Sequence, residues 1–252
     1  MAFIRDGDRL ANNNQLTKAK IEYAKAVELE KKYENSTYSD WFNHNIQDKL
    51  DGIDKRIKEN ERFRNELKAA GATGKSKGHY YVDLGLNVCW ATCNVGANSP
   101  EEYGKYYAWG ETIQKVQYDE STSECYGEEM YDISRSSSYD AARANWGGNW
   151  RMPTRAEFNE LVNRCTWTWT TQKGKSGYKV TGPNGNSIFL PAAGYHAGRS
   201  VYGVGDVGYY WSSTPGESDI NDGAYGLYIS NSDYIMKNCF RYCGMSMRSV
   251  IE

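Results

Sequence analysis

The segment ANWGGNWRMPTRAEFNELV (144–162) carries the clearest fold signal in the chain. A proline bounds its entry, Thr154 and Glu157 have the spacing of an N-terminal capping box, and apolar residues then recur on one helical face. This pattern predicts a helix over 151–165. The helix would bury its apolar face against other elements of the same domain.

The sequence on both sides of this helix reads as strands and turns. Upstream, YYVDLGLNVCWATCNVG (80–96) alternates apolar and other residues with period two, which predicts a strand. Downstream, short apolar segments alternate with Gly, Asn and Ser, and PNGN (183–186) predicts a hairpin turn. The predicted fold class of this half is therefore α+β with long loops.

The N-terminal part has a different character. It is charged, poor in Gly and helix-patterned up to about Ala70, whereas the sequence from His79 onward is rich in Gly, Tyr, Trp and Asn. We expect a helical module at 1–72, a flexible linker at 73–79 that is rich in Gly and Lys, and a larger domain at 80–252.

The first 30 residues resemble one tetratricopeptide repeat, with NNN (12–14) as the turn between two helices. The small and large packing residues of the repeat would be Gly7, Leu10, Leu16, Ala19, Tyr23, Ala26 and Leu29. A single repeat cannot bury its own apolar face, so a plain helical hairpin is the simpler interpretation.

A long charged helix is predicted from about Asp40 to Ala70. Ile46, Leu50, Ile53 and Ile57 form an apolar stripe along it. The stripe would either cover the hairpin, giving a three-helix module, or pair with another chain, giving self-association. Docking of a partner through these helices is the related alternative.

Composition limits the function classes. The 252 residues include 21 Tyr and 8 Trp, enough for a substantial core, and a formal charge of −2 disfavours nucleic acid as a partner. No apolar run is long enough to span a membrane, and the N-terminus lacks the apolar region of a signal peptide. Localisation stays open, and display on a surface or phage particle would need a partner.

Six motifs in order support a family resemblance: VDLGLNVCWATCNVGA (82–97), EEYGKYYAWGE (101–111), the segment 144–162, NSIFLPAAGY (186–195), GYYWSST (208–214) and RYCGMSMRSV (241–250). Together they resemble the Bacteroidetes paralogous domain related to formylglycine-generating enzyme. The resemblance implies a C-type-lectin-like fold: a small twisted sheet, helices beside it, and long irregular segments that form a ligand surface.

The resemblance also implies which residues build the scaffold. These are Trp109, Trp146, Trp150, Arg151, Pro153, Trp211, Arg248 and Val250. Because a buried guanidinium needs a carboxylate or carbonyl partner, we expect Arg151 or Arg248 to pair with Glu157 or Glu111.

Formylglycine-generating enzymes oxidise a substrate cysteine with a copper-binding cysteine pair near their C-terminus. Cys239 and Cys243 lie near that place, but their spacing is shorter than that of the enzyme's pair. We therefore predict a protein that is not an enzyme, with a copper-dependent oxidoreductase as the alternative.

The C-terminal sixty residues resemble the variable protein of a diversity-generating retroelement, in which Asn codons are replaced by codons for many residues. This resemblance implies a ligand-binding surface for varied protein or glycan targets. The predicted surface residues are His196, Arg199, Val201, Tyr202, Asp206, Tyr209, Asp219, Tyr225, Tyr228, Asp233, Tyr234, Asn238, Cys239, Phe240, Tyr242 and Cys243. Tyr225, Tyr228 and Tyr242 are the expected aromatic anchors.

A carbohydrate-binding or adhesion module of fixed specificity is a further alternative. The sequence lacks the Glu-Pro-Asn and Gln-Pro-Asp tripeptides of calcium-dependent sugar sites, and WSST (211–214) stands where Trp-Asn-Asp would be expected. The three His are scattered, so we predict no metal, no cofactor and no catalytic residue.

Overall fold

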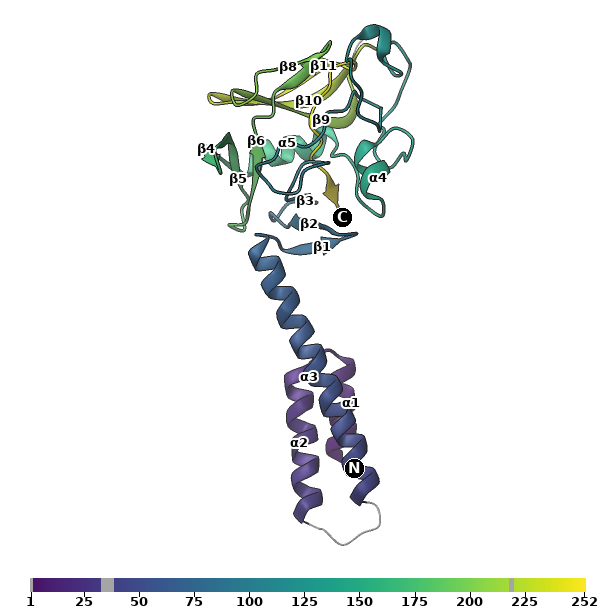
Figure 1. Ribbon diagram of the computed structural model, residues 1–252, viewed down its shortest axis with the longest axis vertical. Helices are drawn as coiled ribbons and strands as arrows, with labels where there is room; N and C mark the ends of the chain where they lie inside the picture. The colour runs from purple at the N-terminus through teal and green to yellow at the C-terminus, as the bar shows by residue number, and fades with distance from the viewer. Residues whose placement is uncertain (1, 33–38, 218–219) are drawn as a thin grey trace. The chain divides into compact units, whose positions relative to one another are not determined.

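The computed structural model describes residues 2–32, 39–217 and 220–252 (Figure 1). The chain is an α+β protein that separates into two compact units, Met1–Lys68 and Ala69–Glu252. In the part of the chain that the structure describes, no helix is both long and apolar enough to cross a membrane.

The described residues of the first unit form three helices, α1 (Ala2–Asn12), α2 (Leu16–Lys32) and α3 (Ser39–Ala69), the last of which ends one residue beyond the unit. Gly7 allows α1 to approach α2, because a Cβ at that position would lie 2.6 Å from the ring of Tyr23. The predicted hairpin is thus formed by α1 and α2. Leu29 does not belong to its core, since this side chain is 45% exposed.

The apolar stripe of α3 packs on the hairpin. Ile46 and Ile53 are buried together with Leu16, Ala19 and Tyr23, and the two other stripe residues pack beside them. Two polar contacts support the same arrangement: the Lys20 ammonium lies 2.5 Å from the Asp54 carboxylate, and the Arg56 guanidinium donates to the Ala11 carbonyl at 3.2 Å. Of the two alternatives for the stripe, the structure has the three-helix module.

The second unit is built from small antiparallel sheets with three short helical elements (Figure 1). Its helical elements are η1 (Glu120–Thr122), α4 (Ala141–Trp146) and α5 (Arg155–Arg164). The strands in chain order are β1 (Gly74–Ser76), β2 (His79–Val82), β3 (Cys89–Ala91), β4 (Thr166–Gln172), β5 (Lys175–Thr181), β6 (Ser187–Pro191), β7 (Tyr195–Ala197), β8 (Ser200–Tyr202), β9 (Val207–Pro215), β10 (Gly223–Ser230), β11 (Asp233–Phe240) and β12 (Val250–Ile251).

The two ends of this unit meet in one sheet with strand order β1-β2-β3-β12. Val250 of β12 pairs with Trp90 of β3, so the C-terminal segment closes the domain against its first hairpin. The expected flexible linker at 73–79 is wrong, because β1 lies there and pairs with β2. A two-residue turn with positive φ at Lys77 (49°) and Gly78 (85°) joins these strands.

The single strand expected over 80–96 is also wrong. The segment instead forms β2, a turn and β3, and the two strands pair with each other through Val82 and Trp90. The Asp83 carboxylate starts the turn by accepting a hydrogen bond from the Gly85 amide at 2.7 Å, and Gly85 has a φ of 73°. The apolar alternation continues through the turn because Leu84 and Val88, which lie between the two strands, are also buried in the core.

Helix α5 packs beside the β9–β10–β11 sheet (Figure 1) and supplies Phe158 and Leu161 to a core that includes Trp90. Its predicted capping box is confirmed, since the Thr154 hydroxyl and the Glu157 carboxylate each accept from the other residue's backbone amide. The predicted 183–186 turn is confirmed as well, because it connects the paired strands β5 and β6.

The expected scaffold residues are largely buried. Trp109 and Trp211 are enclosed in a second core cluster, and their indole N–H groups donate at 2.9 Å to the carbonyls of Ser212 and Tyr107. The pairing of Arg151 with Glu157 is confirmed, with N–O distances of 2.6 and 2.9 Å. Arg248, the other candidate for an ion pair with Glu157 or Glu111, pairs with neither.

The buried guanidinium of Arg248 has no carboxylate partner among the described residues. It donates to the side-chain oxygen of Asn94 and to three backbone carbonyls, those of Ala91, Thr92 and Phe189, at 2.9 to 3.1 Å. Backbone carbonyls suffice here because two segments, 91–92 and β6, bring them to one point. Arg248 thereby ties the C-terminal segment to β3 and β6.

Candidate ligand-binding surface

The β9–β10–β11 sheet positions most of the predicted surface residues. β10 pairs in regular antiparallel register with β11, for example Tyr225 with Asn238 and Tyr228 with Ile235. Because side chains alternate between the faces of a sheet, Tyr228 and Tyr225 point to opposite sides. One face carries Leu227 and packs on α5; we call the other the outer face.

An aromatic row runs along the outer face and onto the β7–β8 hairpin, formed by Tyr202, Tyr195, Tyr209 and Tyr228. Successive ring centroids lie 5.8, 5.1 and 5.1 Å apart. The ammonium of Lys237 lies over the Tyr228 ring at 3.4 Å, and the Tyr202 side chain at the other end is 50% exposed. This row offers a ligand both apolar ring surface and phenol hydroxyls.

Burial makes one phenol of the row, that of Tyr209, less acidic. Burial, together with the smaller effect of the nearby Cys239, raises the pKa of Tyr209 to about 12. Tyr209 therefore stays a neutral hydrogen-bonding phenol at physiological pH.

Two predicted residues lie on the opposite face and do not join this row. The ring of Tyr225 packs against the guanidinium of Arg155, the first residue of α5, at 3.7 Å. Tyr234 stacks on Trp167 of β4 at 4.6 Å and meets the edge of Tyr178 of β5 at 5.4 Å. The structure thus assigns both rings to packing between elements.

His196 and Arg199 lie on the β7–β8 hairpin. The His196 ring is partly buried against Tyr118 (4.7 Å) and Tyr106 (5.6 Å), and burial lowers its pKa. Its backbone exchanges two hydrogen bonds with Gly244, which fixes β7 to the C-terminal segment. Arg199 is exposed, and its guanidinium donates to the Gln117 side chain at 3.0 Å.

The remaining predicted residues are mostly solvent-facing. Val201 on β8 and Phe240 at the end of β11 are exposed apolar side chains. Asp206, Asp233 and Asn238 are exposed polar residues. Asp219 lies outside the described residues.

Cys239 and Cys243 are the two predicted residues relevant to copper. Both are free thiols and pack against the second core cluster beside the outer face. Burial raises the pKa of Cys239 to about 12 and that of Cys243 to about 11. In the absence of a metal both sulfurs are therefore thiols at neutral pH, and a metal ion would have to displace two protons to bind them.

Sequence reasoning missed the contribution of the irregular segment 112–139. Tyr118 exchanges two backbone hydrogen bonds with Gly198 at 2.7 Å, and the Gly127 amide donates to the Asn221 carbonyl at 3.1 Å. These contacts hold the segment beside the predicted surface residues. The ring of Tyr126 lies 5.5 Å from that of Tyr242, and Val116 is strongly exposed. The only sequence signal was the unusual density of Tyr and acidic residues here.

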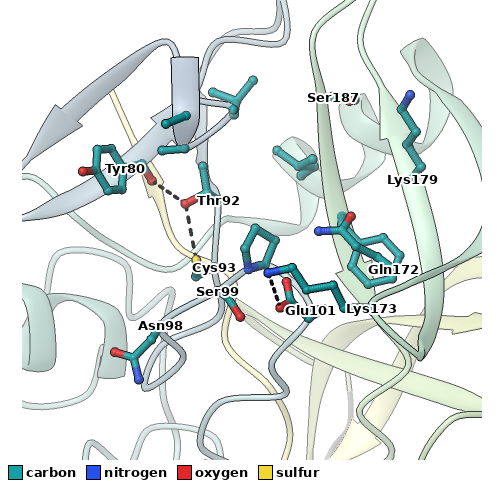
Figure 2. A pocket seen from close by; sticks show the side chains of 17 residues that line it. Tyr80, Thr92, Cys93, Asn98, Ser99, Glu101, Gln172, Lys173, Lys179 and Ser187 are labelled. Atoms are coloured by element: carbon teal, nitrogen blue, oxygen red, sulfur yellow. Dashed lines mark hydrogen bonds and ion pairs between the residues drawn. The ribbon is translucent and has the colours of Figure 1, made fainter. Parts of the chain in front are cut away.

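A separate pocket of about 620 Å³ lies among β2, the 92–101 loop, β4, β5 and β6. Figure 2 shows the Lys173 ammonium directed at the Glu101 carboxylate, 2.9 Å away, with the Thr92 hydroxyl between the Tyr80 carbonyl and Cys93. None of the predicted surface residues that the structure describes lines it. No sequence pattern indicated this pocket.

No family model, curated protein or solved structure matches this chain. The fold and the surface therefore define the class as an α+β protein with an aromatic outer sheet face.

Proposed function

We propose that the second unit is a C-type-lectin-like domain of the kind related to formylglycine-generating enzyme, which binds ligands and is not an enzyme. The supporting architecture is a small sheet with α5 beside it and a long irregular segment folded against the C-terminal residues. The first unit would serve as a docking or display module.

The observation that carries the proposal is the aromatic row Tyr202–Tyr195–Tyr209–Tyr228. Its members come from four different strands, so their positions depend on a hydrogen-bonded framework and not on a mobile loop. Rigid amphipathic rings lose little conformational entropy on binding, which is why they dominate paratopes. The ligand is a protein or a glycan that covers this row.

Diversification by a retroelement is the second part of the proposal. In β9, β10 and the segment that follows β11, buried residues such as Trp211, Leu227 and Arg241 lie beside predicted surface residues that are partly buried, such as Tyr209, Tyr228 and Tyr242. Replacing the solvent-facing side chains changes the surface without opening a cavity in the core. This separation supports a variable surface on a constant scaffold. A fixed-specificity adhesion module is the alternative that the experiment below distinguishes.

The test is to sequence the final two hundred or so bases of the gene from many cells of the source population. We expect changes at Tyr202, Tyr209 and Tyr228, with Trp211 and Arg248 constant, and a nearby adenine-rich near-copy of the segment. An invariant C-terminus would overturn diversification. It would leave a binder of fixed specificity and justify a copper assay on the purified protein.

A further inference from the structure

Three rings form a second aromatic cluster where β11 ends. Phe240 and Tyr242 stack with centroids 5.2 Å apart and planes 7° apart, and Tyr126 packs on Tyr242 at 5.5 Å. Phe240 is 49% exposed. We call Tyr126, Phe240 and Tyr242 the ring cluster. It joins the irregular segment to the C-terminal residues and presents ring surface to solvent.

Carboxylates surround the ring cluster. Residues 119–132 contain six acidic side chains and no Lys or Arg. Burial raises the pKa of Tyr126, and the negative charges of Glu120 and Asp222 raise it further. The same two carboxylates contribute to the raised pKa of Tyr242. Backbone hydrogen bonds place Asp222 beside this cluster, because the Asp222 carbonyl accepts from the Arg241 amide at 2.9 Å and the neighbouring Asn221 carbonyl accepts from the Gly127 amide at 3.1 Å.

The neighbouring cations Arg241 and Lys115 make hydrogen bonds and an ion pair with other groups. Arg241 is buried over Trp109 at 4.6 Å, and its guanidinium donates to the carbonyls of Gly223, Cys125 and Glu128. Lys115 pairs with Glu111 at 2.8 Å. Within the described residues, no ion pair involves Glu120 or Asp222. The ring cluster thus combines the half-exposed ring of Phe240 with two carboxylates. Neither carboxylate makes an ion pair among the described residues, and Asp222 interacts electrostatically with the buried Arg241.

This combination matches the chemistry of an arginine side chain. A guanidinium is attracted to the face of an aromatic ring, stacks on it because it is planar, and donates two parallel hydrogen bonds to a carboxylate. A neutral glycan could stack on the rings, but it would have no electrostatic attraction to the carboxylates.

We propose that the ring cluster, with Glu120 and Asp222, is a subsite for an arginine side chain of a protein ligand. The inference rests on the proposed binding function and makes it more specific, because it selects a protein with an exposed arginine over a neutral glycan.

The first experiment titrates the full chain with the blocked peptide acetyl-Gly-Arg-Gly-amide and with its citrulline analogue, followed by NMR chemical shifts. We expect the arginine peptide to perturb the Tyr126, Phe240 and Tyr242 resonances and to bind about tenfold more tightly than the isosteric, uncharged citrulline peptide at low salt. Equal affinity of the two peptides would overturn the proposal. So would binding of a neutral oligosaccharide at these rings without any response to arginine.

The second experiment uses the double variant E120Q/D222N, which removes both charges and keeps side-chain size. We expect about tenfold weaker binding of the arginine peptide, with no change for the matched control E59Q/E61Q, which removes two charges from exposed residues of α3. Unchanged affinity of the double variant would sink the assignment. Population sequencing decides diversification independently, so the two proposals can fail separately.

Discussion

Tyr234 of β11 stacks on Trp167 of β4, with ring centroids 4.6 Å apart and planes 7° apart. The contact bridges the β9–β10–β11 sheet to the β4–β5–β6 sheet. Tyr234 belongs to the same tyrosine-rich C-terminal sequence as the surface residues. Its position on β11, however, places its side chain on the face of the sheet that packs against the core. The sequence identified a set of candidate surface residues. Strand register divides this set into residues on the outer face and residues that pack between elements.

Tyr234→Ala should therefore destabilise the protein. We expect the free energy of unfolding to fall by about 2 to 3 kcal/mol, because the substitution removes a stack and leaves a gap between two sheets. Tyr202→Ala is the matched control, and its half-exposed ring should cost less than about 1 kcal/mol. Urea unfolding followed by tryptophan fluorescence measures both. Equal losses would contradict the division into surface and packing residues.

Breaking the Arg151–Glu157 pair should have a larger effect. The side chains are only 7% and 15% exposed, and the two hydrogen bonds are parallel. We expect Glu157→Ala to cost about 3 to 5 kcal/mol, since it leaves a buried guanidinium with less compensation and also removes half of the α5 capping box.

The exposed pair between Arg135 and Glu252, at 2.8 Å, provides the control for this prediction. Arg135→Gln should change the free energy of unfolding by less than about 1 kcal/mol. If chemical denaturation gave similar values for both substitutions, burial would not be the factor that makes the Arg151 pair important.

Acid stability should depend on Glu101. The ion pair with Lys173 lowers the pKa of this carboxyl from the ordinary 4.5 to about 2. A lowered folded-state pKa contributes stability above the unfolded-state value, and that stability is lost as the pH falls from about 4.5 to about 2. Urea midpoints measured from pH 6 to pH 2 should fall less steeply for Glu101→Gln than for the wild type. Parallel curves would show that this pair contributes no pH-dependent stability.

The packed stripe of α3 predicts a monomer. Ile46 and Ile53 are used within the first unit and are not available to a second chain. Light scattering on the full chain should give a mass near 28.6 kDa. Ile53→Ala should lower the stability of the helical unit by about 2 to 4 kcal/mol, detectable as an earlier loss of helical circular dichroism on heating. A dimer mass that survives this substitution would mean that another surface associates.

Local rules succeeded where neighbours in the sequence are also neighbours in space. The α5 capping box, the 183–186 turn and the helical hairpin all depend on residues a few positions apart. The 80–96 strand failed because alternation cannot distinguish one strand from a hairpin whose turn also faces the core. The 73–79 linker failed because Gly74 pairs with Tyr81, whose ring covers the glycine and leaves no space for a Cβ.

The sequence by itself determined the α+β class, the helical N-terminal segment and the aromatic richness of the C-terminal region, and it restricted the buried ion pair to Arg151 or Arg248 with Glu157 or Glu111, of which the structure has Arg151 with Glu157. Only the tertiary structure decided which of those aromatic side chains share a surface. It separated Tyr228 from Tyr225 and brought Tyr126 to Tyr242 across more than a hundred residues. The physical reason is that strand register and long-range hydrogen bonds, for which no local pattern codes, set the face on which each side chain lies.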